Sequence, residues 1–198
     1  MSAGRAAPLP AGFYRRDALA LAPALLNKVL VKGNVSGRIV EVEAYGGADD
    51  PASHAFGGRT ARNSTMFGRA GLLYVYFTYG MHHCANVVCG DEGEGTAVLL
   101  RALTPLDGLD EMRARRLAAR SDRELCAGPG RLCQALGIDR LLDGADLVPA
   151  SSGVAVVDDG TPPPAQPGTS GRVGITAAAD RPWRFFVPGA PGLSRRSP

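Results

Sequence analysis

Lysine, histidine and tryptophan are scarce in this sequence. Of its 22 basic residues only Lys28 and Lys32 are lysines, so arginine carries nearly all of the positive charge. Arginine is the better bidentate ligand for phosphate groups, which would suit a polyanionic partner. A GC-rich genome would also favour arginine codons, together with alanine, glycine and proline. For the composition alone, that second explanation is the more economical one.

Cysteine is also rare, and apolar runs are short. The four cysteines, at positions 84, 89, 126 and 133, lack the paired CxxC spacing of a zinc site, and we find no secretion signal. We therefore expect reduced, mostly buried thiols in a cytoplasmic protein. No run of apolar residues approaches the length of a membrane span, which argues against a membrane protein.

The composition that remains is typical of a globular protein. The chain has 198 residues, of which 45% are hydrophobic and 21% charged, and its net charge is +3. This length suits one domain that buries most of its apolar surface without disulfide bonds. Because no repeat or linker divides the chain, we expect one domain at residues 13–190, between a loose arm (1–12) and a flexible tail (191–198).

The most distinctive stretch is LLYVYFTYGMHHCAN, residues 72–86. It begins with β-branched and aromatic residues and reaches a turn at Tyr79-Gly80, which predicts a β-hairpin. With a side-chain period of two, Tyr74 and Tyr76 share one face, while Tyr79 lies at the turn. Packing in a core would explain any one of these tyrosines. Their clustering, with arginine and a carboxylate elsewhere, favours a functional site.

A second strand is predicted at residues 38–45, RIVEVEAY. The alternation puts Glu41, Glu43 and Tyr45 on one face and apolar residues on the other. A solvated strand face would explain the two glutamates. However, glutamate is disfavoured in strands, and the glycine pair that follows Tyr45 indicates a face that opens into a cavity.

Arg101 interrupts an otherwise apolar strand predicted at residues 96–103. A guanidinium there needs an anion, and Glu43, Glu41 or a phosphate would serve. The irregular segment 46–71 is long enough to be functional or disordered. It contains His54, which alone is more typical of a hydrogen-bond partner than of a catalyst, and arginines that could contact an anion.

The other elements are less informative. Asp17 is expected to cap a helix that extends to residue 27, with Leu19, Leu21, Leu25 and Leu26 as core contacts. Strands are predicted at 29–35, 154–157, 172–175 and 183–187, with a proline-rich loop at 158–171, and an arginine-rich helix at 109–120 is read as a solvated surface. A glycine turn opens a helix that ends at Gly137. Its free amides beside Arg131 offer a phosphate seat, with a plain helix start as the alternative.

Taken together, these motifs resemble the alkyladenine DNA glycosylases, also called DNA-3-methyladenine glycosylases of the mammalian type. The matching stretches are RIVEVEAYGGADDPASHAFGGRTARNSTMF, GLLYVYFTYGMHHCANVV, VLLRALTP, LCAGPGRLCQALGI, RVGI and WRFFV. They follow the family's order and cover nearly the whole chain beyond residue 17. The resemblance implies an α+β fold, in which a curved, mainly antiparallel sheet carries surrounding helices and a protruding hairpin.

The resemblance also implies a monofunctional DNA glycosylase of base excision repair, which flips a damaged purine out of duplex DNA and leaves an abasic site. Glu43 would be the general base for a water, and Arg101 and the Val173 carbonyl would hold that water. Glu41 receives no chemical role. No metal, cofactor or Schiff-base lysine is implied.

Substrate and DNA contacts follow from the same motifs. Alkylation makes adenine cationic, so electron-rich rings would bind it by cation–π attraction. The residues implied for the base pocket are Tyr45, His54, Tyr74, Tyr76 and Asn86, where Asn86 would crowd the amine of guanine. Tyr79 would fill the space left in the duplex. Further DNA contacts are expected from Met81, His82, Arg59, Arg62, Gly130 and Arg131.

The expected partner is double-stranded DNA with alkylated purines, including 3-methyladenine and 7-methylguanine and extending to hypoxanthine or ethenoadenine. We expect a monomer in the cytoplasm, used at the bacterial nucleoid. His82-His83 departs from the family's pattern, which has an aromatic ring there, and a chargeable pair could make DNA contact pH-sensitive. Two alternatives are a non-catalytic binder of single-stranded nucleic acid and a formyltransferase-like accessory domain.

Overall fold

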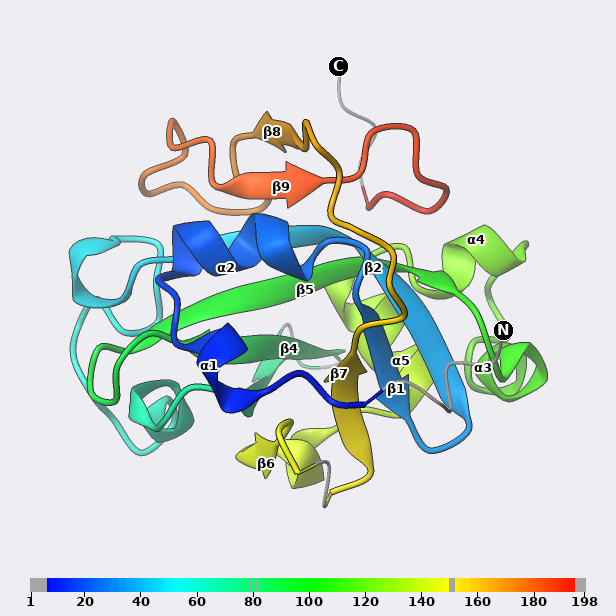
Figure 1. Cartoon of the computed structure of the whole chain (residues 1–198), viewed down its shortest axis with the longest axis horizontal. Helices are drawn as coiled ribbons and strands as arrows, with labels where there is room; N and C mark the ends of the chain where they lie inside the picture. The colour runs from blue at the N-terminus through cyan, green and yellow to red at the C-terminus, as the bar shows by residue number, and fades with distance from the viewer. Residues whose placement is uncertain (1–6, 79, 81, 150–151, 195–198) are drawn as a thin grey trace.

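Nine strands join into one antiparallel sheet in the computed structural model, which describes residues 7–78, 80, 82–149 and 152–194 (Figure 1). The strands are β1 (Val29–Lys32), β2 (Val35–Tyr45), β3 (Leu72–Thr78), β4 (His82–Cys89), β5 (Thr96–Pro105), β6 (Ala145–Asp146), β7 (Val154–Val157), β8 (Gly168–Ser170) and β9 (Arg184–Phe186). Their order is β6-β3-β4-β5-β2-β1-β7, and β9 pairs with both β2 and β8. The α+β fold implied by the sequence is confirmed.

Five α-helices and three short 3₁₀ helices accompany the sheet in the described residues. They are α1 (Ala11–Tyr14), α2 (Ala18–Leu25), α3 (Leu109–Arg115), α4 (Asp122–Leu125), α5 (Pro129–Leu136), η2 (Gly47–Asp49), η3 (Ser64–Phe67) and η4 (Arg140–Leu142). The Asp17 side chain caps α2 by accepting a hydrogen bond from the Ala20 amide at 2.9 Å. Gly137 ends α5 in the left-handed conformation, as the sequence predicted.

Strand β2 is the longest and has partners along both of its edges. β5 pairs with it along its length, while β1 covers the first part of the other edge and β9 covers residues 41–43. Register shifts on either side of Glu41 interrupt the pairing with β5. Such a β-bulge bends a strand and redirects its side chains. The glutamates of β2 therefore lie where strands from three parts of the chain meet.

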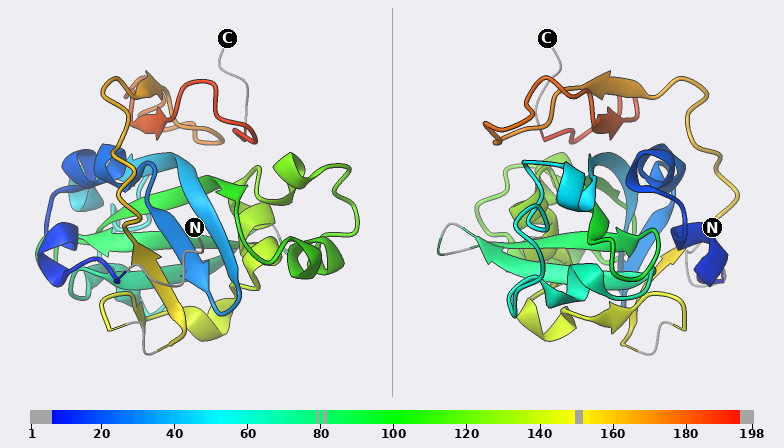
Figure 2. Two further views of the ribbon diagram at one scale, coloured as in Figure 1. Left: turned by 45° about the vertical axis from the view of Figure 1, so that its right-hand side comes forward. Right: turned by 90° about the vertical axis from the view of Figure 1, so that its left-hand side faces the viewer.

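The hairpin predicted at residues 72–86 is formed by β3 and β4. Thr78 pairs with His82 at its outer end, and Tyr74 pairs with Asn86 nearer the sheet. Figure 2 shows the outer ends of these two strands reaching beyond their neighbours. Tyr79 and Met81, to which the sequence assigned DNA contacts, lie outside the described residues.

One main hydrophobic core joins the sheet to the helices. It includes Leu21 and Leu25 of α2, Val42 of β2, and Leu132 and Leu136 of α5. Figure 2 shows β8, β9 and the segment that follows β9 lying together at one end of the molecule, over the end of the sheet. This arrangement brings the last described part of the chain close to β2.

Several details differ from the sequence predictions. Leu19 is 41% exposed, because it lies on the outer side of the short helix α2. Residues 172–175 form a loop in place of the predicted strand, and β8 lies inside the proline-rich segment predicted as a loop. In the arm expected at 1–12, Leu9 is buried and its amide bonds the Val156 carbonyl at 2.9 Å. Burying an apolar side chain against an open strand edge lowers the free energy of the folded protein.

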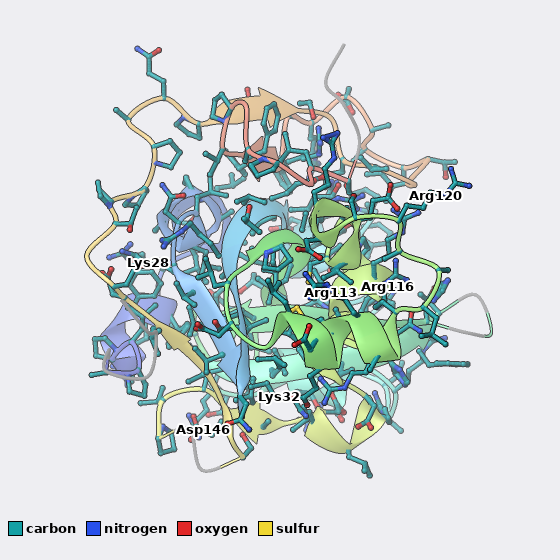
Figure 3. All side chains as sticks on the ribbon, turned by 90° about the vertical axis from the view of Figure 1, so that its right-hand side faces the viewer. Lys28, Lys32, Arg113, Arg116, Arg120 and Asp146 are labelled. Carbon is teal, nitrogen blue, oxygen red and sulfur yellow. The ribbon has the colours of Figure 1, made fainter. Side chains whose placement is uncertain are left out.

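The arginine-rich helix is shorter than predicted and ends at Arg115. Figure 3 shows Arg113, Arg116 and Arg120 on α3 and the loop after it. Arg113 is half exposed and pairs with Asp110 and Asp122, so that part of the surface is solvated, as the sequence suggested. No helix in the described residues is long and apolar enough to cross a membrane.

Candidate active site

Two stacked tyrosines of β3 form one wall of a cavity. The ring centroids of Tyr74 and Tyr76 lie 5.5 Å apart with planes at 29°, as expected for neighbours on one strand face. Tyr74 is buried, and its hydroxyl lies 3.2 Å from Nδ1 of His54. The His54 ring meets Tyr76 edge to face at 4.5 Å between centroids. Three of the predicted pocket residues are thus brought together.

The segment around Asn63 holds His54 in this position. The Asn63 side-chain amide donates to the backbone carbonyls of His54 and Gly58, at 2.8 and 3.0 Å. Burial, with a contribution from the positive charge of Arg62, lowers the pKa of His54 below its usual value. The imidazole is therefore mainly neutral at neutral pH and presents an uncharged ring to the cavity.

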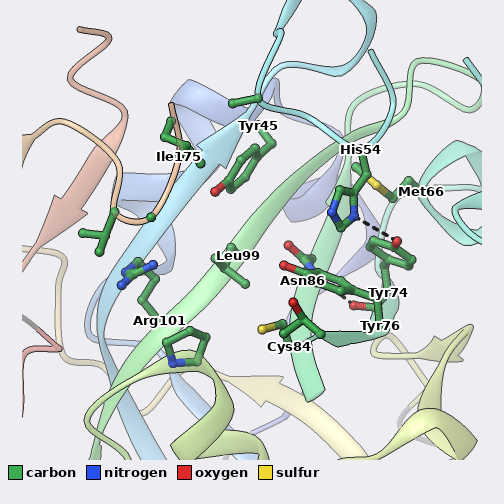
Figure 4. Close-up of a pocket in the computed structure, with 15 residues that line it drawn as sticks. Tyr45, His54, Met66, Tyr74, Tyr76, Cys84, Asn86, Leu99, Arg101 and Ile175 are labelled. Carbon is green, nitrogen blue, oxygen red and sulfur yellow. Dashed lines mark hydrogen bonds between the residues drawn. The ribbon is translucent and has the colours of Figure 1, made fainter. Parts of the chain in front are cut away.

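The cavity itself has a volume of about 210 Å³. Figure 4 shows Tyr45 and Arg101 on one side of it and His54, Tyr74 and Tyr76 on the other, with Leu99 between them. Its lining is completed by Ala52, Met66, Thr78, Cys84, Asn86, Pro129, Val173, Gly174 and Ile175. The Asn86 side chain donates to the Tyr74 carbonyl across the hairpin at 3.2 Å. All five residues predicted to bind the base therefore line this cavity.

Glu43 lies directly behind the cavity wall and is fully buried. One carboxylate oxygen, Oε1, accepts a hydrogen bond from the Val173 amide at 2.7 Å. The other, Oε2, accepts from the Tyr45 hydroxyl at 3.0 Å and lies 3.3 Å from a guanidinium nitrogen of Arg101. Since Tyr45, Arg101 and Val173 all line the cavity, the carboxylate is one side chain removed from it.

This burial changes the acidity of Glu43. Removal from water raises the pKa of its carboxyl group above the usual value, and the negative charge of Glu41 adds to the rise. The Arg101 charge and the hydrogen bonds from Val173 and Tyr45 lower the pKa of Glu43, but they offset only part of this rise. A carboxylate with a raised pKa is a stronger base, so Glu43 is suited to accept a proton.

Glu41, the second glutamate of β2, is fully buried in a different set of contacts. Its carboxylate accepts hydrogen bonds from Arg101 at 3.0 Å, from Arg184 at 2.7 Å, and from the amide and hydroxyl of Ser194, each at 2.6 Å. Burial alone would raise the pKa of Glu41, but these donors lower it below its usual value. The solvated strand face considered for both glutamates is thus wrong, because each has cationic or backbone donors inside the protein.

A buried ion pair fixes the loop that supplies Val173. Arg172 forms two hydrogen bonds to the Asp50 carboxylate and a third, at 3.1 Å, to the Ala44 carbonyl; both charged side chains are fully buried. The Arg172 guanidinium also lies over the rings of Tyr45 and Trp183, at 4.8 and 5.0 Å. The Arg172 side chain therefore connects the loop that carries Val173 to the end of β2 and to Asp50.

The sequence predictions missed this pair and the hydrogen bond from the Val173 amide to Glu43. The role that the resemblance gives to the Val173 carbonyl, as a ligand of the water, stays a prediction. Asp50 and Arg172 are 122 residues apart, and no local pattern relates them. The only signals were an arginine within an apolar stretch, which needs an anion, and an acidic residue beside a proline.

Among the residues predicted to contact DNA that the structure describes, Arg62, His82 and Gly130 make contacts at the β3–β4 hairpin. Arg62 donates to the Phe77 carbonyl at 3.2 Å, which links the irregular segment to β3. His82 is exposed, and its ring packs so closely on Gly130 that a side chain there would meet it at 3.0 Å. Arg59 and Arg131 are exposed to solvent. Any side chain at position 130 would therefore require His82 to shift.

The chemistry available at the site comes from amino-acid side chains. Within the described residues, no group of three or more histidine, cysteine, aspartate or glutamate side chains could hold a metal ion. All four cysteines are buried and form no disulfide bond. What the arrangement offers is one carboxylate poised to accept a proton, a fixed positive charge beside it, and aromatic rings that enclose a flat ligand.

The sequence of the chain matches a known protein family over most of its length. A family model described as methylpurine-DNA glycosylase matches residues 12–191. A relative from Burkholderia lata is 56% identical over 92% of this chain and 89% of its own length. Relatives from Streptomyces avermitilis and Methanoculleus marisnigri are each 49% identical, over 94% and 95% of this chain and 91% and 99% of their own lengths. All three are provisionally named 3-methyladenine DNA glycosylase.

Proposed function

The chain belongs to the methylpurine-DNA glycosylase family, and we propose that it flips 3-methyladenine or 7-methylguanine out of duplex DNA and hydrolyses the glycosidic bond with a water activated by Glu43. The observation that carries this proposal is the contact of the buried Glu43 carboxylate with three groups that line the aromatic cavity. As a DNA glycosylase, the chain is neither a non-catalytic binder nor an accessory domain.

The flipped base would lie between Tyr45 on one side and Tyr76 with His54 on the other. Adenine methylated at N3 and guanine methylated at N7 carry a positive charge on the ring while they are bonded to the sugar, and electron-rich aromatic faces attract cations by about 0.5–2 kcal/mol. A neutral His54 suits this arrangement because it adds no positive charge beside the cationic base. Asn86 lines the same cavity beside Tyr74, its partner across the hairpin, and would meet the exocyclic groups at the purine edge.

The hydrolysis would need a single carboxylate. Water oxygen attacks C1′ of the sugar, the C1′–N bond breaks, and its electron pair neutralises the cationic base, which leaves uncharged. The proton of the water passes to Glu43, whose raised pKa favours that transfer. No acid is required to protonate the leaving group, unlike ordinary glycoside hydrolysis. Arg101 would stabilise the carboxylate and hold the water between Tyr45 and Val173.

The substrate class can be tested by following base release from methylated duplex DNA and from duplexes that carry one hypoxanthine or one ethenoadenine. After division by the spontaneous rates, we expect the cationic bases to be released about 2- to 30-fold faster than the neutral ones, in line with the cation–π term. Released bases are separated by chromatography. No release of methylated bases by the wild type would overturn the proposed function.

Tyr45→Phe tests the hydrogen bond that Glu43 receives. The change keeps the ring and removes a hydroxyl that lowers the pKa of Glu43. The acidic limb of the pH–rate profile should therefore move upward by about one unit, since a hydrogen bond to a charged group contributes about 1.5 kcal/mol. Tyr74→Phe is the control, because its hydroxyl contacts His54. If Tyr45→Phe and Tyr74→Phe had the same pH–rate profile, the assignment of Glu43 as the base would be contradicted.

A further inference from the structure

Ser194 lies between the Glu41 carboxylate and the Arg101 guanidinium, which in turn contacts Glu43. Its hydroxyl donates to Oε1 of Glu41 at 2.6 Å and accepts from a terminal nitrogen of Arg101 at 3.0 Å. Its amide donates to the other oxygen of Glu41, also at 2.6 Å. One residue from the last described part of the chain thus satisfies a buried carboxylate and a buried guanidinium together.

These contacts leave the Arg101 guanidinium little freedom. Its Nε donates to Glu41 at 3.0 Å, one terminal nitrogen donates to Ser194 at 3.0 Å, and the other lies 3.3 Å from Glu43. A guanidinium is planar with a fixed fork of donors. When two of its nitrogens are held, the direction of the third is determined.

The backbone brings Ser194 to this position by a close approach to α4. Gly192 has a φ of +84°, and a side chain there would meet the Arg123 carbonyl oxygen at 2.7 Å. Nearby, the Thr104 hydroxyl donates to the Pro191 carbonyl at 3.3 Å. The hydrogen bond ties the segment 188–194 to β5, and the close approach at Gly192 shows that the segment also packs against α4. The serine is therefore anchored on its N-terminal side, independently of its contacts with the charged groups.

We propose that Ser194 is a positioning residue for the reaction, and that its hydroxyl, by bridging Glu41 and Arg101, keeps the Arg101 guanidinium directed at Glu43. The inference rests on the proposed role of Glu43 as the base. In this arrangement, Glu41 and Ser194 each accept a hydrogen bond from Arg101 and together fix its orientation. Glu41 would thus contribute to the reaction by orienting Arg101, although it takes no part in proton transfer.

The effect on Glu43 follows from the groups that face it. These are Arg101 from β5, Tyr45 and Glu41 from β2, Cys84 from β4, and Arg184, which is paired with Glu43 in register from β9. Arg184 is bound to Glu41, and among the residues that the structure describes Arg101 is the cation that forms an ion pair with Glu43. Loss of the serine hydroxyl would let the guanidinium turn towards Glu41, and the pKa of Glu43 would rise.

Ser194→Ala tests this inference through the pH–rate profile of base release under single-turnover conditions. We expect its acidic limb to move to higher pH by about half a unit or more, because a nearby opposite charge lowers a carboxyl pKa by about 1–3 units and part of that is lost. Ser194→Thr keeps the hydroxyl and should restore the wild-type profile. Binding to damaged DNA should be unchanged in both variants.

Ser170→Ala is the matched control. The Ser170 hydroxyl accepts from Arg184 at 2.9 Å, so it belongs to the same network around Glu41 but does not contact Arg101 in the contacts described. Its acidic limb should stay at the wild-type position. Should Ser194→Ala fail to fold, Ser194→Cys, with its weaker donor, is measured instead, and a smaller shift in the same direction is expected.

Two results would overturn the inference: an acidic limb of Ser194→Ala at the wild-type pH, or an equal shift in Ser170→Ala. Failure of the proposed function would look different, because the wild type itself would then release no base or would show no acidic limb. A loss of rate at every pH with an unmoved limb would also count against Ser194 as a positioning residue, since that pattern reports only damaged packing.

Discussion

Glu43→Gln should release methylated bases about 10²–10⁴-fold more slowly than the wild type, the usual contribution of a general base. Glutamine has nearly the same shape and can still accept a hydrogen bond from the Val173 amide, but it cannot take a proton from water. The aromatic cavity is unchanged, so binding to damaged duplex DNA should be retained. Single-turnover release and a binding titration on the same substrate separate the two effects.

The pH dependence gives a second measure of the same residue. Because the pKa of Glu43 is raised, the wild-type rate should fall with decreasing pH at a point above the ordinary titration range of glutamate. This limb should be absent from whatever activity Glu43→Gln retains. Glu111→Gln, at a glutamate on α3 that pairs with Arg115, is the control and should behave as the wild type. Release by Glu43→Gln within tenfold of the wild type would rule out Glu43 as the base.

Arg172→Ala should be the most destabilising single change among those considered, at about 3–5 kcal/mol of unfolding free energy. Removing one partner of a buried ion pair leaves the other charge uncompensated, and the Asp50 carboxylate here is fully buried. The change also releases the loop that carries the Val173 amide, so base release should fall along with stability. Denaturant unfolding at neutral pH measures the loss.

Acid titration provides the check on this prediction. Hydrogen bonds and charge from Arg172, with backbone donors, lower the pKa of Asp50 in spite of its burial. A depressed folded pKa gives stability that is present above the unfolded pKa of about 4 and is lost as the pH falls through the folded value. The stability gap between wild type and Arg172→Ala should therefore narrow in acid.

Arg181→Ala serves as the control for Arg172. Arg181 also lies over the Trp183 ring, at 4.7 Å, and comes within 3.8 Å of Asp50, but its side chain is 34% exposed. Because Arg181 is partly exposed and lies at the distance limit of an ion pair, its loss should cost little more than that of a surface pair, which contributes about 0–1 kcal/mol. If both substitutions destabilised the protein equally, the burial of the Asp50–Arg172 pair would not be what stabilises the loop.

Local patterns were sufficient to predict the parts of the site that lie on single strands. Alternation placed Tyr74 beside Tyr76, and it placed Glu43 two residues from Tyr45 on one face of β2, as observed. The rule that a buried guanidinium needs an anion led from Arg101 to the two glutamates. These predictions worked because a strand with a fixed period determines which side chains are neighbours.

Contacts between distant segments were beyond such patterns. Ser194 meets Glu41 from 153 positions away, and Val173 meets Glu43 from 130 positions away. Both segments are rich in glycine and proline, and their paths depend on tertiary contacts such as the Arg172 pair. The strand predicted at 172–175 was wrong for this reason: apolar residues that pack over a cavity look the same in sequence as residues of a strand.

Because Val173 contacts Glu43 from 130 positions further along the chain, translation produces the hairpin tyrosines long before the contacts around Glu43 are complete. A ribosome that has added residues 1–100 has already produced the whole β3–β4 hairpin and the strand that bears Glu43, yet neither the loop nor the serine that complete the charge network. A chain of that length contains the tyrosines of the cavity but lacks Arg101, Val173 and Ser194, which contact Glu43 and Glu41. Synthesis in this order therefore completes the aromatic wall well before the contacts that surround the Glu43 carboxylate.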